Sequence, residues 1–149
     1  MKTVLLLSAI LAAVLVFMLV KNARTPSHLG ITNGELAPVP KTPNGVSSQT
    51  NDPDKLVAPF PFKGDLDKTK ALIKQALQAY GNMIIRSETD DYIHAVNTTP
   101  VLRFKDDLEF YFLNDERIVH VRSASRIGYS DLGLNKRRYT RLMEIYNDR

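Results

Sequence analysis

The densest group of side chains suited to chemistry lies between Arg122 and Arg138. Planar arginine forks pair well with carboxylates and phosphates, and a glycine in the same turn lets backbone N–H groups approach an anion. Hydroxyl, amide and carboxylate groups follow near the expected start of a helix, where the helix dipole favours negative charge. The pattern predicts a site for an anionic ligand, formed by Arg122, Ser123, Ser125, Arg126, Ser130, Asp131, Asn135 and Arg138.

The arginines of this stretch also have acidic residues with which they could pair. A buried network of arginines and carboxylates fixes the shape of a loop without binding anything. The candidate partners for Arg126 and Arg138 are Asp106, Asp107 and Asp131. Internal networks of this kind are commoner than ligand sites, and the two can coexist, so both interpretations stay open on the sequence.

A second cluster of chemistry-bearing residues is acidic and contains Asp106, Asp107 and Glu109. Paired carboxylates serve acid–base catalysis or hold a hard cation. On a strand, Asp107 and Glu109 share one face, whereas Asp106 points elsewhere or sits in the preceding turn. The commoner roles of such a cluster are a solvated edge or partners for arginine. A hydrolase or metal-dependent enzyme that uses these carboxylates is therefore the alternative hypothesis.

Two histidines could join the acidic cluster on one face of a sheet. His94 and His120 share a face with Glu109 if the strands pair in simple order, and that set of ligands would suit zinc. Surface or half-buried histidines are far commoner than ligands, so we expect no metal. The chain contains no recognisable catalytic motif. We accordingly expect no catalytic residue and no cofactor.

The elements that must position these residues follow from the periodicity. Asp65 is a candidate N-cap for a helix in which apolar residues recur from Leu66 to Tyr80 at helical spacing, and Gly81 is a stop signal. A last helix is predicted to start with Asn135 as its N-cap. Four strands are predicted between the helices, at Asn82–Glu88, Tyr92–Thr98, Asp107–Leu113 and Ile118–Ser123.

The short connections between these strands predict an antiparallel sheet. In the third strand Leu108, Phe110 and Phe112 alternate with polar residues, so one face of the sheet is buried. Val119 and Val121 are expected on that face, with His120 and Arg122 on the other. The fold class is therefore α+β, with a helix, a four-stranded antiparallel sheet and a helix, and both helices cover one sheet face.

An apolar segment precedes this domain. Residues 4–20 carry no charge, and this run is long enough to cross a bilayer as a helix. A cleavable signal peptide is the competing interpretation, but no small-x-small cleavage site follows the run. We expect a single-pass membrane anchor at residues 1–21, a Pro-rich tether at 22–42 and a domain at 43–149. The short head before the run favours a domain on the extracytoplasmic, periplasmic side.

The net charge and the amino-acid composition limit the classes of binding partner that we expect. The net charge of +4 is too small for the basic footprint of a nucleic-acid-binding protein. The expected partners are the membrane, through residues 4–20, and an anionic small molecule or a protein. The chain has no cysteine, which removes disulfides, thiolate metal sites and cysteine nucleophiles.

Three stretches resemble one known family. Residues 122–138 read R-S-A-S-R-I-G-Y-S-D-L-G-L-N-K-R-R, residues 104–110 read F-K-D-D-L-E-F, and residues 43–48 read P-N-G-V-S-S. Together they closely resemble the bacterial and plastid family called domain of unknown function 1499, over about residues 39–149. The chain has Val39 and Gly45 where that family has cysteines, and the joint loss is typical of a structural pair. The resemblance implies an exported or membrane-associated domain and carries no activity with it.

The sequence supports three hypotheses. The first is a membrane-anchored, non-enzymatic module that binds an anionic ligand or a partner through residues 122–138. The second is the enzyme that uses Asp106, Asp107 and Glu109. In the third, the loop is structural scaffolding alone, and burial of Arg126 against carboxylates would favour it.

Overall fold

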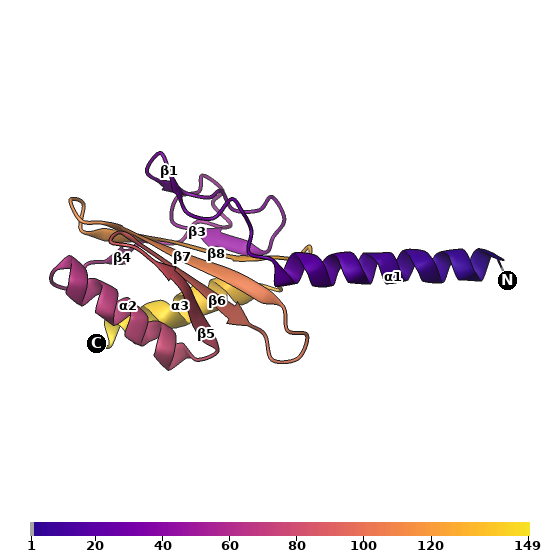
Figure 1. The fold of residues 1–149 in the computed structure, drawn as a ribbon. Coiled ribbons are helices and arrows are strands. Elements are labelled where there is room, and N and C mark those ends of the chain that lie inside the picture. Colours follow the sequence, from indigo (N-terminus) through magenta and orange to yellow (C-terminus); the bar gives the residue numbers. More distant parts are fainter. Residues whose placement is uncertain (1) are drawn as a thin grey trace.

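A long N-terminal helix leaves one end of the α+β domain (Figure 1). The computed structural model describes residues 2–149. The helix, α1, spans Lys2–Ala23 and is apolar and exposed over nearly its whole length. It is long and apolar enough to cross a membrane, a property that it shares with signal sequences.

Ten further elements follow α1, and the four predicted strands and both predicted helices are among them. The first four are the short strands β1 (Ile31–Thr32), β2 (Glu35–Leu36), β3 (Gly45–Ser47) and β4 (Phe60–Pro61). The next are α2 (Leu66–Tyr80), β5 (Met83–Glu88), β6 (Tyr92–Thr98), β7 (Lys105–Leu113), β8 (Ile118–Ser125) and α3 (Leu134–Asn147).

The main sheet is larger than the predicted four strands. Its order is β3-β8-β7-β6-β5, β4 also pairs with β8, and every pairing is antiparallel. The four-stranded prediction was too small because it missed β3 and β4. Each contributes only two or three residues from Pro-rich sequence, too few for an alternating pattern to be visible.

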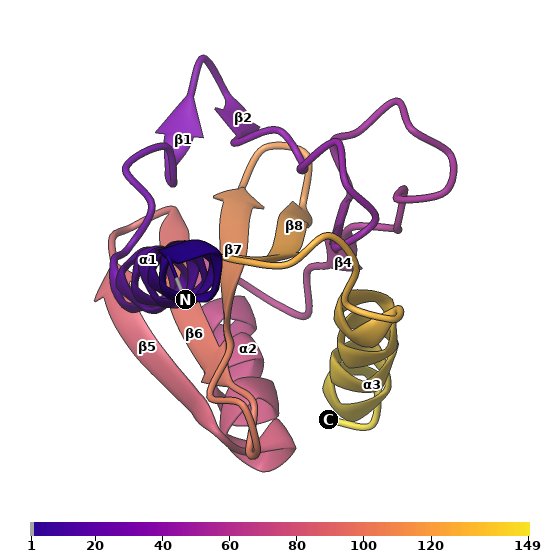
Figure 2. The same ribbon diagram turned by 90° about the vertical axis from the view of Figure 1, so that its right-hand side faces the viewer.

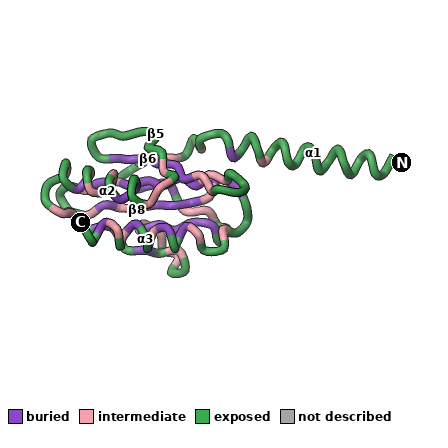
Figure 3. The backbone as a smooth tube through the Cα atoms, turned by 90° about the horizontal axis from the view of Figure 1, so that it is seen from below, coloured by how far each residue is buried: buried purple, intermediate pink, exposed green. Residues whose placement is uncertain are grey.

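Helices α2 and α3 cover one face of the sheet, as predicted (Figure 1). Phe60 lies at the centre of this core, with its ring 5.9 Å from that of Phe110 and 5.4 Å from that of Tyr146, in edge-to-face geometry. Figure 3 shows the buried strands enclosed between exposed surfaces, whereas α1 projects into the open. The core includes Ile73, Leu77, Ile93, Leu108, Phe110, Phe112, Val119, Val121 and Leu142.

The two helices begin differently from one another. Asp65 is the N-cap of α2 and its carboxylate accepts a hydrogen bond of 2.8 Å from the Lys68 amide, as predicted. The prediction that Asn135 caps α3 was wrong, because Gly133 precedes the helix and Asn135 lies inside its first turn. The Asp131 carboxylate accepts from the amides of Gly133 and Asn135 instead.

Residues 24–42 pass over the sheet face opposite the two helices, and α1 leaves from this side of the molecule (Figures 1 and 2). Residues Leu36 and Ala37 are buried in this layer. The amide of Gly30 and the carbonyl of Pro38 bond to side chains of the sheet. The segment predicted as a tether therefore covers a sheet face that would otherwise be open to solvent.

The close approach of β3 to β8 gives a test of the enlarged sheet. A Cβ added to Gly45 would lie 2.9 Å from the Ala124 Cβ and 3.1 Å from the Ser123 carbonyl oxygen. We expect Gly45→Ala to lower the free energy of unfolding by about 1–3 kcal/mol, because the extra methyl overpacks the strand pair. Urea unfolding of the full chain in neutral detergent, followed by near-UV circular dichroism, measures the change. Asn51→Ala, at an exposed position nearby, is the control, and equal stability of the two variants would contradict the pairing.

Candidate functional site between the N-terminal helix and the sheet

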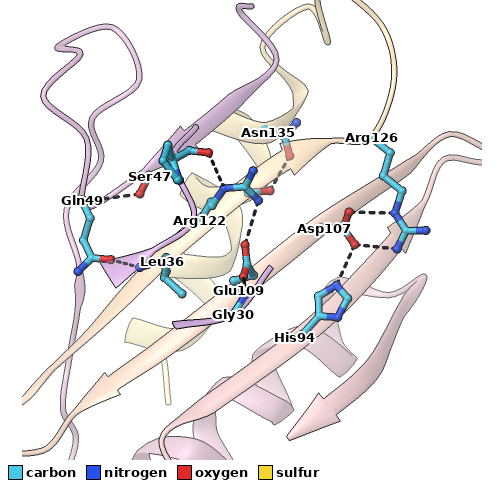
Figure 4. A network of polar contacts seen from close by, with 12 residues as sticks. Gly30, Leu36, Ser47, Gln49, His94, Asp107, Glu109, Arg122, Arg126 and Asn135 are labelled. Atoms are coloured by element: carbon cyan, nitrogen blue, oxygen red, sulfur yellow. Dashed lines mark hydrogen bonds and ion pairs between the residues drawn. The ribbon is translucent and has the colours of Figure 1, made fainter. Parts of the chain in front are cut away.

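The buried carboxylate of Asp107 is the centre of the polar cluster on the covered sheet face. Arg126 approaches it with two parallel hydrogen bonds, Nε to Oδ2 at 2.9 Å and Nη2 to Oδ1 at 2.7 Å (Figure 4). His94 Nε2 lies 2.8 Å from the same Oδ1. An ionised carboxylate only accepts hydrogen bonds, so this histidine nitrogen carries the proton. The three side chains form a closed, buried unit.

Glu109 forms a second buried unit two residues further along β7. Its Oε2 accepts from Arg122 Nη1 at 2.9 Å, and its Oε1 accepts from the Tyr92 hydroxyl and from the Gly30 amide, both at 2.8 Å. The Nε of Arg122 donates to the Pro38 carbonyl at 3.3 Å. Because Gly30 and Pro38 belong to the covering segment, this unit fastens that segment to the sheet (Figure 4).

Asp106 lies on the opposite face of β7, beneath the helices, as the alternation predicted. Arg138 from α3 donates to its carboxylate at 2.5 Å and also bonds Asn97 and Asn135. The Nε of Arg138 has no hydrogen-bond partner in the described chain, although the side chain is only 1% exposed. The Asn135 side chain connects this unit to Asn44 and to the hydroxyls of Ser123 and Ser125.

The eight predicted ligand residues are therefore divided among three environments. The three arginines, at 2%, 8% and 1% exposure for Arg122, Arg126 and Arg138, are each paired with a carboxylate. Ser123 and Ser125 each hydrogen-bond to the side chain of Asn135 in the first turn of α3. Ser130 and Asp131 lie in the loop before α3, where Ser130 accepts from the Leu132 amide of the loop and Asp131 accepts from the Asn135 amide of the helix. This pairing favours the internal network over direct ligand binding by the arginines.

The acidic cluster is likewise divided. Asp107 and Glu109 share the covered face, while Asp106 is separated from them by the sheet. His94, Glu109 and His120 share one face, as expected from simple strand order, but His120 contacts Ser48 rather than a carboxylate. Within residues 2–149 no group of three His, Asp or Glu side chains is placed to hold a metal ion.

The end of α1 is built into the same network. Arg126 Nη1 donates to the carbonyls of Asn22, Ala23 and Arg24, at 3.2, 3.4 and 3.0 Å. These are carbonyls that a helix C-terminus leaves without partners, and a cation suits that end of the helix dipole. The Asn22 side chain donates to the Arg103 carbonyl and accepts from the Lys105 amide. One guanidinium thus joins the sheet to α1.

A cavity of about 580 Å³ lies at this junction. Phe17 and Val20 of α1 supply an apolar wall, and Ser125 and Arg126 lie on the domain side. Lys21, Arg24 and His28 bring basic groups that are exposed to solvent. Lys21 and Arg24 form no ion pair within residues 2–149. The cavity therefore combines an apolar side with two cations available to a ligand.

Lys21, Asn22 and Arg24 were not predicted from the sequence as residues of a site. The two cations were interpreted only as charges that flank a membrane span. Asn22 carries no local signal, because its partners lie more than 80 residues away in the chain. Long-range pairing of this kind is set by the fold and not by neighbouring residues.

Burial and hydrogen bonding set the protonation of the cluster. Burial opposes ionisation of Asp107, but the hydrogen bonds from His94 and Arg126 and the charge of Arg126 outweigh it and lower the pKa of the carboxyl. Burial, together with the charge of Glu109, raises the pKa of the Tyr92 hydroxyl, which stays protonated and donates to that carboxylate. Burial lowers the pKa of His120, against the opposing charge of Glu116.

The lowered pKa of Asp107 predicts an acid-dependent loss of stability. A carboxylate whose pKa is depressed on folding stabilises the protein above its ordinary pKa of 3.8, and this contribution is lost as the pH falls through that of the folded state. We expect Asp107→Asn to cost about 3–5 kcal/mol at neutral pH, because it leaves Arg126 buried without its anion. The gap between variant and wild type should narrow in strongly acidic buffer.

Unfolding curves across a pH series measure this gap. Asp115→Asn, in the exposed turn between β7 and β8, is the matched control and should follow the wild type at every pH. Parallel pH profiles for wild type and Asp107→Asn would contradict an ionised, paired Asp107.

No curated protein matches the chain. A family model described as "Protein of unknown function (DUF1499)" matches residues 35–145, which include every strand of the main sheet and the residues of all three buried arginine–carboxylate pairs. The match spans well over half of the chain, and the chain belongs to this family.

Proposed function

We propose that this protein is a single-pass membrane protein whose extracytoplasmic domain is a non-enzymatic module for an anionic amphiphile. The ligand site is the cavity between the end of α1 and β8. The observation that carries the proposal is the combination of an apolar wall from Phe17 and Val20 with unpaired cations at Lys21 and Arg24. A molecule with an anionic head and an apolar tail matches both parts.

The contacts of Asn22 support a membrane helix that stays attached. Asn22 is only 9% exposed, and its side chain hydrogen-bonds to two backbone groups at the start of β7. Cleavage after residue 22 or 23, as a signal peptide would require, removes the Asn22 carbonyl that accepts from Arg126 Nη1 and the side-chain bonds of Asn22 to the start of β7. An uncleaved anchor avoids this cost.

The arginines serve the proposed site by holding its walls. The guanidinium of Arg126 donates to the Asp107 carboxylate and to carbonyls at the end of α1. These bonds fix the angle between α1 and the sheet. Arg122 fixes the covering segment through Pro38. The scaffolding and binding hypotheses are thereby combined, with scaffolding assigned to the buried arginines and binding to the exposed cations.

The geometry gives the enzymatic alternative less support. The three carboxylates of Asp106, Asp107 and Glu109 are held on two faces of the sheet, and each is bonded by an arginine. A general acid or base needs a labile proton or a free lone pair directed at a substrate.

Thermal unfolding of the full chain in neutral maltoside detergent tests the ligand class. A single-chain anionic phospholipid at about 100 times its dissociation constant should stabilise the protein by about 2.7 kcal/mol, which raises Tm measurably. The zwitterionic analogue tests the need for negative charge, and inorganic phosphate tests the need for a tail. We expect a rise with the anionic phospholipid alone.

Variants that lack the two exposed cations test whether the rise in Tm comes from binding in the cavity. The double variant Lys21→Gln and Arg24→Gln should lose the rise in Tm while remaining folded, because neither side chain is buried. Lys136→Gln, at an exposed site in α3, removes a charge elsewhere and should keep the rise. No rise in the wild type, or equal rises in both variants, would overturn the proposed site.

The side of the membrane on which the domain lies has a separate test. The chain has no cysteine, so Asp115→Cys introduces a single thiol in the exposed β7–β8 turn. In intact bacterial spheroplasts we expect a membrane-impermeant maleimide to label this thiol fully, since the domain faces outward. Labelling only after lysis would place the domain in the cytoplasm.

A further inference from the structure

The turn between β6 and β7 exposes two adjacent large apolar side chains. Val101 is 87% exposed and Leu102 is 66% exposed. Single exposed apolar residues are ordinary on a protein surface, but neighbouring ones at the tip of a turn indicate a contact surface. Arg103 and Lys105 follow them, and residues 99–105 contain no acidic residue. The turn therefore presents an apolar tip with a basic flank.

This turn is tied to the end of the membrane helix. The Asn22 amide donates to the Arg103 carbonyl at 2.9 Å and its oxygen accepts from the Lys105 amide at 2.8 Å, as a neighbouring peptide group would. Figure 1 shows the β6–β7 turn at the end of the domain from which α1 leaves, pointing in the direction of the α1 N-terminus. When residues 4–20 span the hydrocarbon, Lys21 lies at the headgroups, and the turn beside Asn22 lies near the same level.

We propose that the β6–β7 turn is a second membrane contact, in which Val101 and Leu102 insert at the boundary between headgroups and acyl chains. Arg103 and Lys105 then face the headgroups, where anionic lipid attracts basic residues. The inference rests on the membrane anchor of the proposed function, and it is independent of any ligand in the cavity. The partner is the lipid surface of the leaflet that surrounds α1.

Single-cysteine fluorescence tests this contact in the full chain. Leu102→Cys is labelled with the environment-sensitive dye NBD, and the chain is reconstituted in vesicles of phosphatidylcholine and phosphatidylglycerol. Asp115→Cys, in the turn at the opposite end of β7, is the matched control. We expect the dye at position 102 to emit at shorter wavelength and to be quenched severalfold more by brominated lipid than the dye at position 115. In pure phosphatidylcholine vesicles the quenching at 102 should weaken.

Each other result has a defined meaning. Equal, solvent-like emission at both positions in vesicle-bound protein overturns the second contact and leaves the anchor intact. A blue shift at 102 without quenching by brominated lipid means that the tip is covered by protein, which also overturns the lipid contact. Flotation of the vesicles identifies a failure of the anchor itself, because protein that does not float with lipid contradicts both proposals.

Discussion

The rest of the structure depends on how one buried cation is neutralised. Arg126 cannot lose its proton, so its burial requires acceptors on every side. Asp107 supplies two of them from the sheet, and the last carbonyls of α1 supply the others. Each partner is itself incomplete without the arginine, since a helix end leaves carbonyls unpaired and a buried carboxylate needs a counter-charge. Arg126 therefore contacts the helix, the sheet and the loop after β8 at once, and the hydrogen bonds of Asn22 add a second link between the helix and the sheet.

The two sheet faces are stabilised by different physical means. Beneath α2 and α3, aromatic and aliphatic side chains around Phe60 exclude water in the ordinary way. On the other face the buried groups are charged. Their hydrogen bonds to the backbone of Gly30 and Pro38 fix the conformation of the covering segment, which has little regular secondary structure of its own. Buried ion pairs add little net stability but impose geometry. The polar face thus specifies where α1 and the covering segment lie, while the apolar face supplies most of the free energy of folding.

The sequence was informative where structure is set by local periodicity. Alternation in β7 gave the correct faces for Leu108 and Asp107, and the capping signal at Asp65 gave the start of α2. Prediction from the sequence failed where the structure depends on residues that are distant in the chain. The strands β3 and β4 form only because β8 offers them an edge, and Asn135 is drawn into the helix by contacts with Ser123 and Asn44. The composition of residues 122–138 identified the arginines as important, but charge alone does not distinguish a ligand partner from a carboxylate that the fold brings close.

The hydrogen bonds of Asn22 have a mechanical consequence. A flexible linker between a helix and a domain does not transmit rotation of the helix to the domain. Here the last turn of α1 is clamped by Arg126 and by the backbone at the start of β7, so helix and domain turn as one body. One residue more or less in α1 changes the azimuth of the helix by about 100°. In the membrane-anchored protein proposed above, the number of residues in α1 therefore sets the rotation of the domain about the membrane normal.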